Sequence, residues 1–524
     1  MVIFVQRIHC GFILCYTDGA LNLLDHTKTE LIIPDGITGP ATNYQRYSIY
    51  TKLTPPRRKP PHPFIPKVRK TGLAKLILKE ALHDGLKLSK KEYRNALLSR
   101  PCIYGTFSGP FGGFHPIQEK CTGCMRCVQE YPGVCTVDRN PEFYTFADSY
   151  WTSEGAATTS GSPAATVAYE AETGKIPIKG MGYKGAFVGP GWDSIWTDMS
   201  EIVRPTRDGV YGREFISTVV DVGGKRRFLQ FDNGNPIHLS RSVGVSLPIV
   251  FDYLPPNLNS QSILESIAGA AVKADTYFIA SPAKANGLPE AQQQRLIPLV
   301  SPNHIAENAD FVRRVRLVEL ETCEVSSFAT AQSELRNLNP KVVLSVRLPL
   351  TENAPEQANT LAQNGADVIH LTANYHGEEL SSESPRFIKD LIREVQGKLV
   401  RESCRDDLTL IASGGITRAE HVPKAIICGA DLVAINTTVL VALQSRFDGE
   451  CVSPESGRIA PERFDSRWGE QRLVNLLASW HDQLIEILSA MGMRDVRRLR
   501  GDVGRAMFNE DLEMEAFRDI ARRN

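Results

Sequence analysis

The feature that most constrains the fold of this chain is an alternation of short apolar runs and helical segments that begins near residue 245. Runs of this length, rich in Val, Ile and Leu, are typical of parallel strands with both faces covered. There are eight of them: SLPIVFDY, TYFIAS, RLIPLVS, VRLVELE, VVLSVRLP, ADVIHLTA, LTLIASGG and ADLVAINT. Four intervening segments have apolar residues at helical spacing: SILESIAGAAVKA, SSFATAQSELRNL, PEQANTLAQNGA and AEHVPKAIICGA.

This alternation predicts parallel strands joined by crossover helices, and eight strands predict a closed (β/α)8 barrel, the TIM barrel. The segment between the second and third runs has the weakest helical pattern, so a doubly wound open sheet is the alternative. After the barrel, QRLVNLLASWHDQLIEILSAMGM has one apolar face and predicts a helix that packs against the barrel.

The length of 524 residues exceeds what one hydrophobic core usually supports, so several domains are expected. Residues 73–98 predict one or two helices, and the Pro-rich stretch TPPRRKPPHPFIPK predicts a linker. The predicted parts are an N-terminal segment and linker (1–59), a helical, cysteine-containing module (60–145), a connector over the barrel (146–244), the barrel (245–450) and a helical C-terminal extension (451–524).

Composition argues against several classes of partner. The 60 basic and 60 acidic residues balance, so neither nucleic acid nor a charged membrane surface is an expected partner. No stretch approaches the roughly 18 apolar residues of a spanning helix, and Arg7 and His9 interrupt the apolar N-terminus, which argues against a signal peptide. Eleven cysteines without small-domain spacing argue against a disulfide scaffold and predict the cytoplasm.

Three cysteines, Cys121, Cys124 and Cys127, form the run CTGCMRC. The CxxCxxC spacing lets three thiolates meet one face of an iron-sulfur cluster. The simplest fourth ligand is Cys135, in YPGVC, and Cys102 is the reserve candidate. Ferredoxins usually place the fourth cysteine three residues after the third and before a proline. This departure leaves a 4Fe–4S cluster, a 3Fe–4S cluster and a structural zinc site as alternatives.

Glycine and polar residues follow the last two predicted strands. Ser413, Gly414 and Gly415 come after the seventh run, and Asn436 and Thr437 come after the eighth. Barrels bind phosphate at these strand ends, where glycines leave backbone N–H groups accessible. We interpret the two segments as a phosphate site, with a tight turn after the strand as the alternative.

The sixth run leads into TANYHGEELSSESP, which places four polar residues at a strand end and in the loop after it: His370, Thr372, Asn374 and His376. Reacting groups of barrel enzymes stand at this end of the strands. His370 and His376 are therefore candidates for proton transfer. An ordinary polar loop is the alternative for His376.

Three stretches together resemble the glutamate synthase-related, FMN-binding proteins: GYKGAFVGPGWDSIWTDMSEIVRPTRDGVYGREFI, LIASGGITRAEHVPKAIICGADLVAINTTVL and LIEILSAMGMRDVRRLRGDVGRAMF. The resemblance runs from about residue 180 to 510. It implies FMN at the C-terminal mouth of the barrel, where the strand-end residues Thr372, Ser413, Gly414, Gly415, Asn436 and Thr437 are expected to bind it. It also implies hydride transfer to an imine made from a 2-oxo acid and ammonia, with glutamate as product and the cluster as electron relay.

Arg347, in the fifth run, stands where that family has a lysine beside the flavin. An arginine keeps the positive charge that stabilises reduced flavin, but it cannot donate a proton. We therefore expect Arg347 to be a catalytic and flavin-binding residue acting through its charge. The alternative partner is a barrel carboxylate such as Glu319.

Other differences between this sequence and the resembled family change which partners we expect. The glycine-rich substrate loop and the glutaminase domain of the family have no counterpart, and no strand-linked GxGxxG fingerprint for NAD(P)H is present. We expect an electron-donor protein or reductase subunit, and ammonia that is free or supplied by a separate amidotransferase subunit. Two other functions stay open: an FMN oxidoreductase acting on a hydroxy acid or another imine, and a noncatalytic electron-transfer or assembly subunit.

Overall fold

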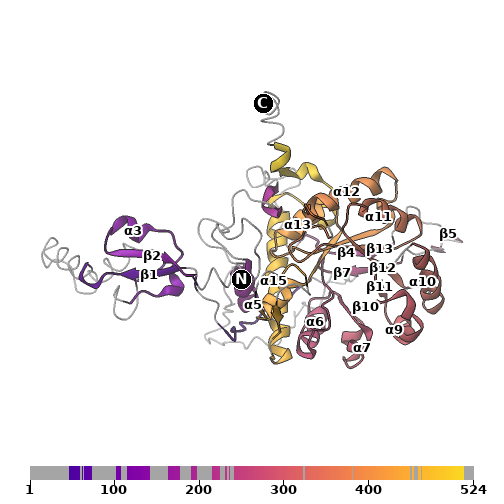
Figure 1. The fold of residues 1–524 in the computed structure, drawn as a ribbon, viewed down its shortest axis with the longest axis horizontal. Helices are drawn as coiled ribbons and strands as arrows, with labels where there is room; N and C mark the ends of the chain where they lie inside the picture. The colour runs from indigo at the N-terminus through magenta and orange to yellow at the C-terminus, as the bar shows by residue number, and fades with distance from the viewer. Residues whose placement is uncertain are drawn as a thin grey trace, which may run out of the picture. The chain divides into compact units, whose positions relative to one another are not determined.

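The computed structural model shows the barrel and the segments around it (Figure 1). The helices predicted at 73–98 and the N-terminal segment up to residue 46 lie outside the described residues. The structure describes residues 47–58, 62, 64–72, 102–107, 115–141, 163–176, 191–197, 215–224, 231–232, 235–236, 241–322, 325–380, 382–448, 451–453, 458–461 and 463–512.

Eight parallel strands close into a barrel in sequence order, and the last strand pairs with the first. Each predicted apolar run supplies one strand, so the predicted (β/α)8 barrel is confirmed and the open sheet is wrong. Most of the side chains on these strands are buried. The strands are β8 (Ile249–Phe251), β9 (Phe278–Ala280), β10 (Leu296–Val300), β11 (Leu317–Leu320), β12 (Val343–Pro349), β13 (Val368–Thr372), β14 (Thr409–Ser413) and β15 (Leu432–Ile435).

The four predicted crossover helices are present as α6 (Gln261–Lys273), α10 (Val325–Leu338), α11 (Ala354–Gln363) and α13 (His421–Cys428). The segment between the second and third strands, whose helical pattern is the weakest, holds only two short helices. Pro282 is the first residue of one helix and Pro289 directly precedes the other, and proline is tolerated at a helix start but not in a helix interior. The other helices around the barrel are α7 (Pro282–Ala285), α8 (Glu290–Gln293), α9 (Ala309–Arg314), α12 (Ile388–Arg401) and α14 (Thr437–Ala442).

The long amphipathic helix predicted after the barrel is α15 (Ser466–Ala490), and it packs against α6, α14 and α5 (Pro163–Thr173) (Figure 1). Asp465 caps its first turn by accepting the backbone N–H of Arg467. Arg472 is fully buried and donates to the carbonyl oxygens of Ala442 at 2.7 Å and Thr54 at 3.1 Å. Within the described residues, no helix has both the length and the hydropathy needed to cross a membrane.

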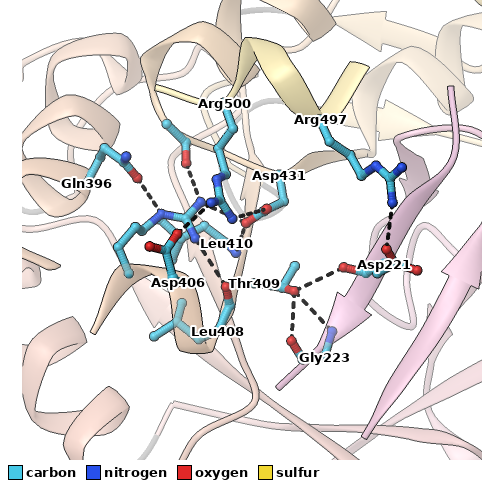
Figure 2. Close-up of polar contacts among 12 residues, drawn as sticks. Asp221, Gly223, Gln396, Asp406, Leu408, Thr409, Leu410, Asp431, Arg497 and Arg500 are labelled. Carbon is cyan, nitrogen blue, oxygen red and sulfur yellow. Dashed lines mark hydrogen bonds and ion pairs between the residues drawn. The ribbon is translucent and has the colours of Figure 1, made fainter. Parts of the chain in front are cut away.

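The amino end of the barrel is closed by an antiparallel hairpin of β4 (Val220–Gly223) and β7 (Ser242–Val245), which contacts β12 and β14. The hydroxyl of Thr409, at the start of β14, exchanges hydrogen bonds with the backbone of Gly223 at 3.0 Å (Figure 2). On the same side Arg497 pairs with Asp221, and Arg500 pairs with Asp431 just before β15. The opposite, carboxyl end of the strands is therefore left for the site.

Two further parts of the chain meet through short strand pairs. The segment β3 (Ile195–Thr197) pairs with β18 (Ala506–Phe508) of the C-terminal extension. These strands come from two of the three stretches that carry the family resemblance, so tertiary structure joins them. The remaining pairs are β5 (Phe231–Asp232) with β6 (Asn235–Pro236), and β16 (Arg446–Asp448) with β17 (Arg458–Ala460).

The cysteine-containing module has a small buried cluster of its own, made by Cys102, Phe107, Cys127 and Cys135. Its strands β1 (Phe64–Val68) and β2 (Cys135–Arg139) pair antiparallel, and α3 (Arg126–Glu130) begins inside the CxxCxxC run.

Candidate active site

Charged and polar side chains from four barrel strands meet at one point. Arg347 on β12 contacts Glu319 on the adjacent strand β11 and Asp252 just after β8. Strands β8 and β12 lie on opposite sides of the eight-stranded ring, so a direct contact between their side chains crosses the barrel interior. We call the set Asp252, Glu319, Ser345, Arg347 and His370 the interior cluster.

Arg347 is bound on two sides by carboxylates. Its Nε lies 2.9 Å from Oε1 of Glu319, and its Nη2 donates to Oδ1 of Asp252. Burial alone would lower the pKa of Arg347, but the charges of Asp252 and Glu319 raise it above its ordinary value. The pairing with Glu319, the alternative weighed from the sequence, is what the structure contains. The protein itself therefore balances this charge, and no anionic cofactor is needed for that purpose.

Glu319 is the centre of the interior cluster. Its side chain is fully buried, and burial favours the neutral carboxyl, yet the charges and hydrogen bonds of His370 and Arg347 lower its pKa to about 2. The hydroxyl of Ser345 donates to Oε2 at 3.0 Å. Glu319 is therefore an ionised carboxylate that only accepts hydrogen bonds.

His370 completes the interior cluster from β13. Its Nδ1 lies 3.0 Å from Oε2 of Glu319, and because that carboxylate is ionised, Nδ1 is the donor. The Nε2 atom is buried and has no hydrogen-bond partner among the described residues. Buried polar atoms almost always have a partner in native proteins. His370 thus has one nitrogen held by Glu319 and one nitrogen left for a ligand.

The end of β15 adds two of the predicted cofactor-binding residues. Asn436 donates from Nδ2 to Oδ2 of Asp252 at 3.1 Å, and its Oδ1 accepts the N–H of Thr437 at 2.6 Å. The hydroxyl of Thr437 is buried and has no partner among the described residues. At the neighbouring strand ends, Thr372 and Ser413 are buried and lie opposite each other in the β13–β14 register.

Gly414 and Gly415 both adopt left-handed backbone conformations, with φ of 99° and 67°. A Cβ on Gly414 would meet the carbonyl oxygen of Asn374, and a Cβ on Gly415 would lie 2.6 Å from the Cα of Gly377. The loop after β13 therefore fills the space beside both glycines. The tight-turn alternative accounts for them without a ligand, and their role in phosphate binding stays a prediction.

Replacing Gly415 by alanine is expected to lower the free energy of unfolding by about 1–3 kcal/mol, since the new Cβ would be both strained and in contact with backbone. Urea unfolding measures this change. Gly287→Ala is the matched control, because no atom lies within 4 Å of its Cβ position. Equal effects in the two variants would show that the close approach of the two loops is not required.

His376 lies on the loop after β13, outside the contacts that build the interior cluster. Asn374 shapes this loop, because its Oδ1 accepts the backbone N–H groups of His376 at 2.9 Å and Glu378 at 2.8 Å. The carbonyl oxygen of His376 faces Gly415. Of the three predicted catalytic residues, the structure joins Arg347 and His370 through Glu319, and it places His376 near the predicted phosphate loop.

Sequence reasoning missed Asp252 and Ser345. Asp252 directly follows the first apolar run, so the strand-end rule that selected Asn436 would have selected it too. Ser345 lies two residues before Arg347 on the same strand and therefore on the same face. That these residues contact Glu319 and Arg347 follows only from the closure of the barrel.

The cysteines of the CxxCxxC run surround a small cavity. Cys102, Cys121, Cys124 and Cys127 all line it. Burial, and then the neighbouring Cys121, Cys102 and Cys124, raise the pKa of Cys127. None of the described cysteines is in a disulfide. Within the described part of the chain, no three Cys, His, Asp or Glu side chains converge closely enough to hold a single metal ion.

A closed (β/α)8 barrel with a buried, charged cluster reaching toward the carboxyl ends of its strands defines the class of TIM-barrel enzymes. Residues 319–494 match the family model described as the conserved region in glutamate synthase, a range that includes four of the five interior-cluster residues. Over this range the chain is similar to glutamate synthases.

Relatives of this family match most of the chain. The archaeal-type glutamate synthase (NADPH) of Dehalococcoides mccartyi is 23% identical over 445 residues, which cover 73% of this chain and 86% of that protein. The archaeal glutamate synthase (NADPH) of Archaeoglobus fulgidus is 24% identical over 473 residues, 76% of this chain and 89% of that protein. A mandelate oxidase carrying an FMN adduct aligns with a TM-score of 0.40 at 15% identity, over 59% of this chain and 87% of that chain.

Proposed function

We propose that this protein is an FMN-dependent oxidoreductase that reduces the imine formed from a 2-oxo acid and ammonia, with glutamate as the product. The relationship to glutamate synthases supports the reaction class. The observation that carries the proposal is the interior cluster, which presents the unpartnered Nε2 of His370 inside the barrel.

The residues present fit FMN. The buried polar atoms that lack hydrogen-bond partners among the described residues include Nε2 of His370 on β13 and the hydroxyl of Thr437 after β15. FMN carries ring carbonyl and ribityl hydroxyl groups and a phosphate, which are suitable partners for both atoms. When bound, the flavin supplies hydride exchange with the substrate.

Each residue of the interior cluster has a proposed role. Glu319 fixes the orientation and tautomer of His370, so that Nε2 can hold the proton needed by the reacting nitrogen. Arg347 fixes the positions of the two carboxylates that balance its charge, and its contacts link β8 and β11 to β12 across the barrel. The interior cluster thus combines a proton-transfer group with a preorganised charge.

Electrons would reach the flavin through an iron-sulfur cluster in the cysteine-containing module. The relatives are named for NADPH. For this chain we infer that a separate electron-donor protein or reductase subunit supplies the electrons. Ammonia would come from solution or from a separate amidotransferase subunit.

The test is anaerobic incubation of the full-length protein with FMN, followed by assay of glutamate formation from 2-oxoglutarate and ammonium with reduced methyl viologen as electron donor. Bound flavin and ammonium-dependent glutamate formation are expected. Bound flavin with turnover of hydroxy acids only would show that the substrate class is wrong. Failure to bind FMN would overturn the proposal as a whole.

Thr437→Val is expected to weaken FMN binding about tenfold, because one hydrogen bond worth roughly 1.4 kcal/mol is lost while the side-chain shape is kept. Fluorescence quenching of FMN on titration with protein measures the affinity. Thr360→Val, on the outer face of α11, is the control and should bind FMN as the native protein does. An unchanged affinity in Thr437→Val would show that this hydroxyl does not contact the cofactor.

A further inference from the structure

The structure points to a fourth cluster ligand different from the one that is nearest along the chain. We propose that Cys102, rather than Cys135, is the fourth thiolate ligand of a single 4Fe–4S cluster also held by Cys121, Cys124 and Cys127. The assignment rests on the iron-sulfur cluster of the proposed function and adds the ligand that the sequence spacing leaves open.

The cavity beside the CxxCxxC run separates the two candidates. Cys102 lines this cavity together with all three cysteines of the run, and Cys135 is not among its lining residues. A cuboidal cluster offers a different iron to each thiolate, so its ligands surround a space and do not converge on one point. Cys102 and the three cysteines of the run line one cavity, as the ligands of such a cluster would.

A hydrogen-bonded turn holds Cys102 in this position. The carbonyl oxygen of Cys102 accepts the N–H of Gly105 at 3.2 Å, and Gly105 has a φ of 76° that favours glycine. The carbonyl oxygen of Thr106 accepts the N–H of Ile117 at 2.7 Å, which ties the turn to the segment leading into Cys121. Residues far apart in sequence are thereby held at one site.

The hydroxyl of Thr106 adds a second observation. It lies 3.2 Å from Sγ of Cys102, where the thiol donates to it. If Cys102 becomes a thiolate ligand, the same hydroxyl can turn and donate to the sulfur. Hydrogen bonds to ligand sulfurs are one of the means by which proteins set the potential of an iron-sulfur cluster.

Cys135 has a structural position instead. It is the first residue of β2 and pairs with Val68 of β1, and its N–H donates to the carbonyl oxygen of Tyr131 at 3.1 Å. Its side chain is 4% exposed and shares the small buried core with Cys102 and Cys127, but unlike these two it does not line the cavity. We therefore assign Cys135 to this core as a small hydrophobic residue.

The sequence of the run fits a single cluster with a distant fourth ligand. In the C-x2-C-x2-C-x3-C-P run of two-cluster ferredoxins, the fourth cysteine binds the other cluster, so the fourth ligand of each cluster comes from outside its own run. Here Tyr131 stands at that fourth position, followed by Pro132. Tyr131 provides no thiolate for a second cluster, and Cys102 takes the place of the distant ligand.

The experiment compares Cys102→Ala with Cys135→Ala in the full-length protein after anaerobic incubation with iron and sulfide. Iron and acid-labile sulfide per chain, and electron paramagnetic resonance of the oxidised and reduced forms, are the readouts. We expect Cys102→Ala to lose the cluster or hold a three-iron cluster, and Cys135→Ala to keep the native 4Fe–4S signal. Circular dichroism of both variants without iron checks that they fold alike.

The opposite pattern, or equal loss of iron in two folded variants, would overturn the assignment, because Cys135 would then be needed. A native protein that takes up no iron and sulfide, or holds only a three-iron cluster, would also overturn it. The FMN proposal is judged separately from flavin binding in the same samples, so the two failures are distinguishable.

Discussion

Arg347→Met is expected to lower the free energy of unfolding by about 3–5 kcal/mol, the usual cost of removing one partner from a buried ion pair. Asp252 and Glu319 are 3% and 0% exposed in the side chain, so the substitution leaves two carboxylates in the barrel interior without their shared cation. We expect reduced FMN binding as well. Denaturant unfolding and flavin content of the purified variant measure the two effects.

Arg313→Met is the matched control. Arg313 pairs with Asp310 at 2.9 Å on the surface of α9, where both side chains are more than half exposed. Removing such a surface pair costs about 0–1 kcal/mol. The loss of stability in Arg347→Lys should lie between the losses in these two variants. One ammonium group keeps the charge but does not contact both carboxylates as a guanidinium does. Equal stability of Arg347→Met and Arg313→Met would contradict the proposed role of the interior cluster.

Unfolding at acid pH tests the contact between Arg347 and Glu319 in the native protein. Glu319 has a pKa lowered from 4.5 to about 2, so its contribution to stability is fully present above about pH 4.5 and is lost as the pH falls toward 2. Arg347→Met removes one cause of this lowered pKa. The loss of stability should therefore begin at a higher pH in the variant than in the native protein.

His370→Gln is expected to lower kcat for imine reduction by about 10²- to 10⁴-fold, the contribution of a positioned acid or base. Glutamine can still donate a hydrogen bond to Glu319, but its amide does not exchange a proton near neutral pH. The temperature of unfolding should change little, and kcat is measured with FMN in excess because Nε2 of His370 is also a proposed partner of the cofactor.

His481→Gln is the control for a histidine outside the site. His481 lies on α15 with its ring against Tyr47, at 5.0 Å between centroids. Its replacement should leave kcat unchanged. A native-like rate in His370→Gln, or a similar loss in both variants, would remove His370 from the reaction.

The barrel was predictable from sequence because parallel strands covered on both faces are continuous apolar runs, and each of the eight runs became one strand. Strand-end residues were also predictable, since side chains that follow parallel strands gather at one edge. This reasoning selected His370 and Asn436, and the family resemblance selected Arg347; all three contact the charged groups of the barrel interior.

The partners of these residues were decided by tertiary structure. Asp252 reaches Arg347 only because the sheet closes and brings β8 opposite β12, a relation that spacing along the chain does not contain. Gly414 and Gly415 are common to a phosphate site and to a tight packing of two loops, and only the position of the loop near Gly377 shows which atoms lie beside them.

In the cysteine-containing module, too, the sequence predicts some site residues and the tertiary structure positions the others. Sequence predicts Cys121, Cys124 and Cys127 as cluster ligands through their local spacing, because three ligands within one turn of chain need no knowledge of the fold. Distance along the chain favours Cys135 as the fourth residue, whereas the folded turn at Cys102 lines the cavity. Local spacing thus predicts the ligands that one loop can supply, whereas the position of Cys102 at the cavity depends on hydrogen bonds that the spacing does not contain.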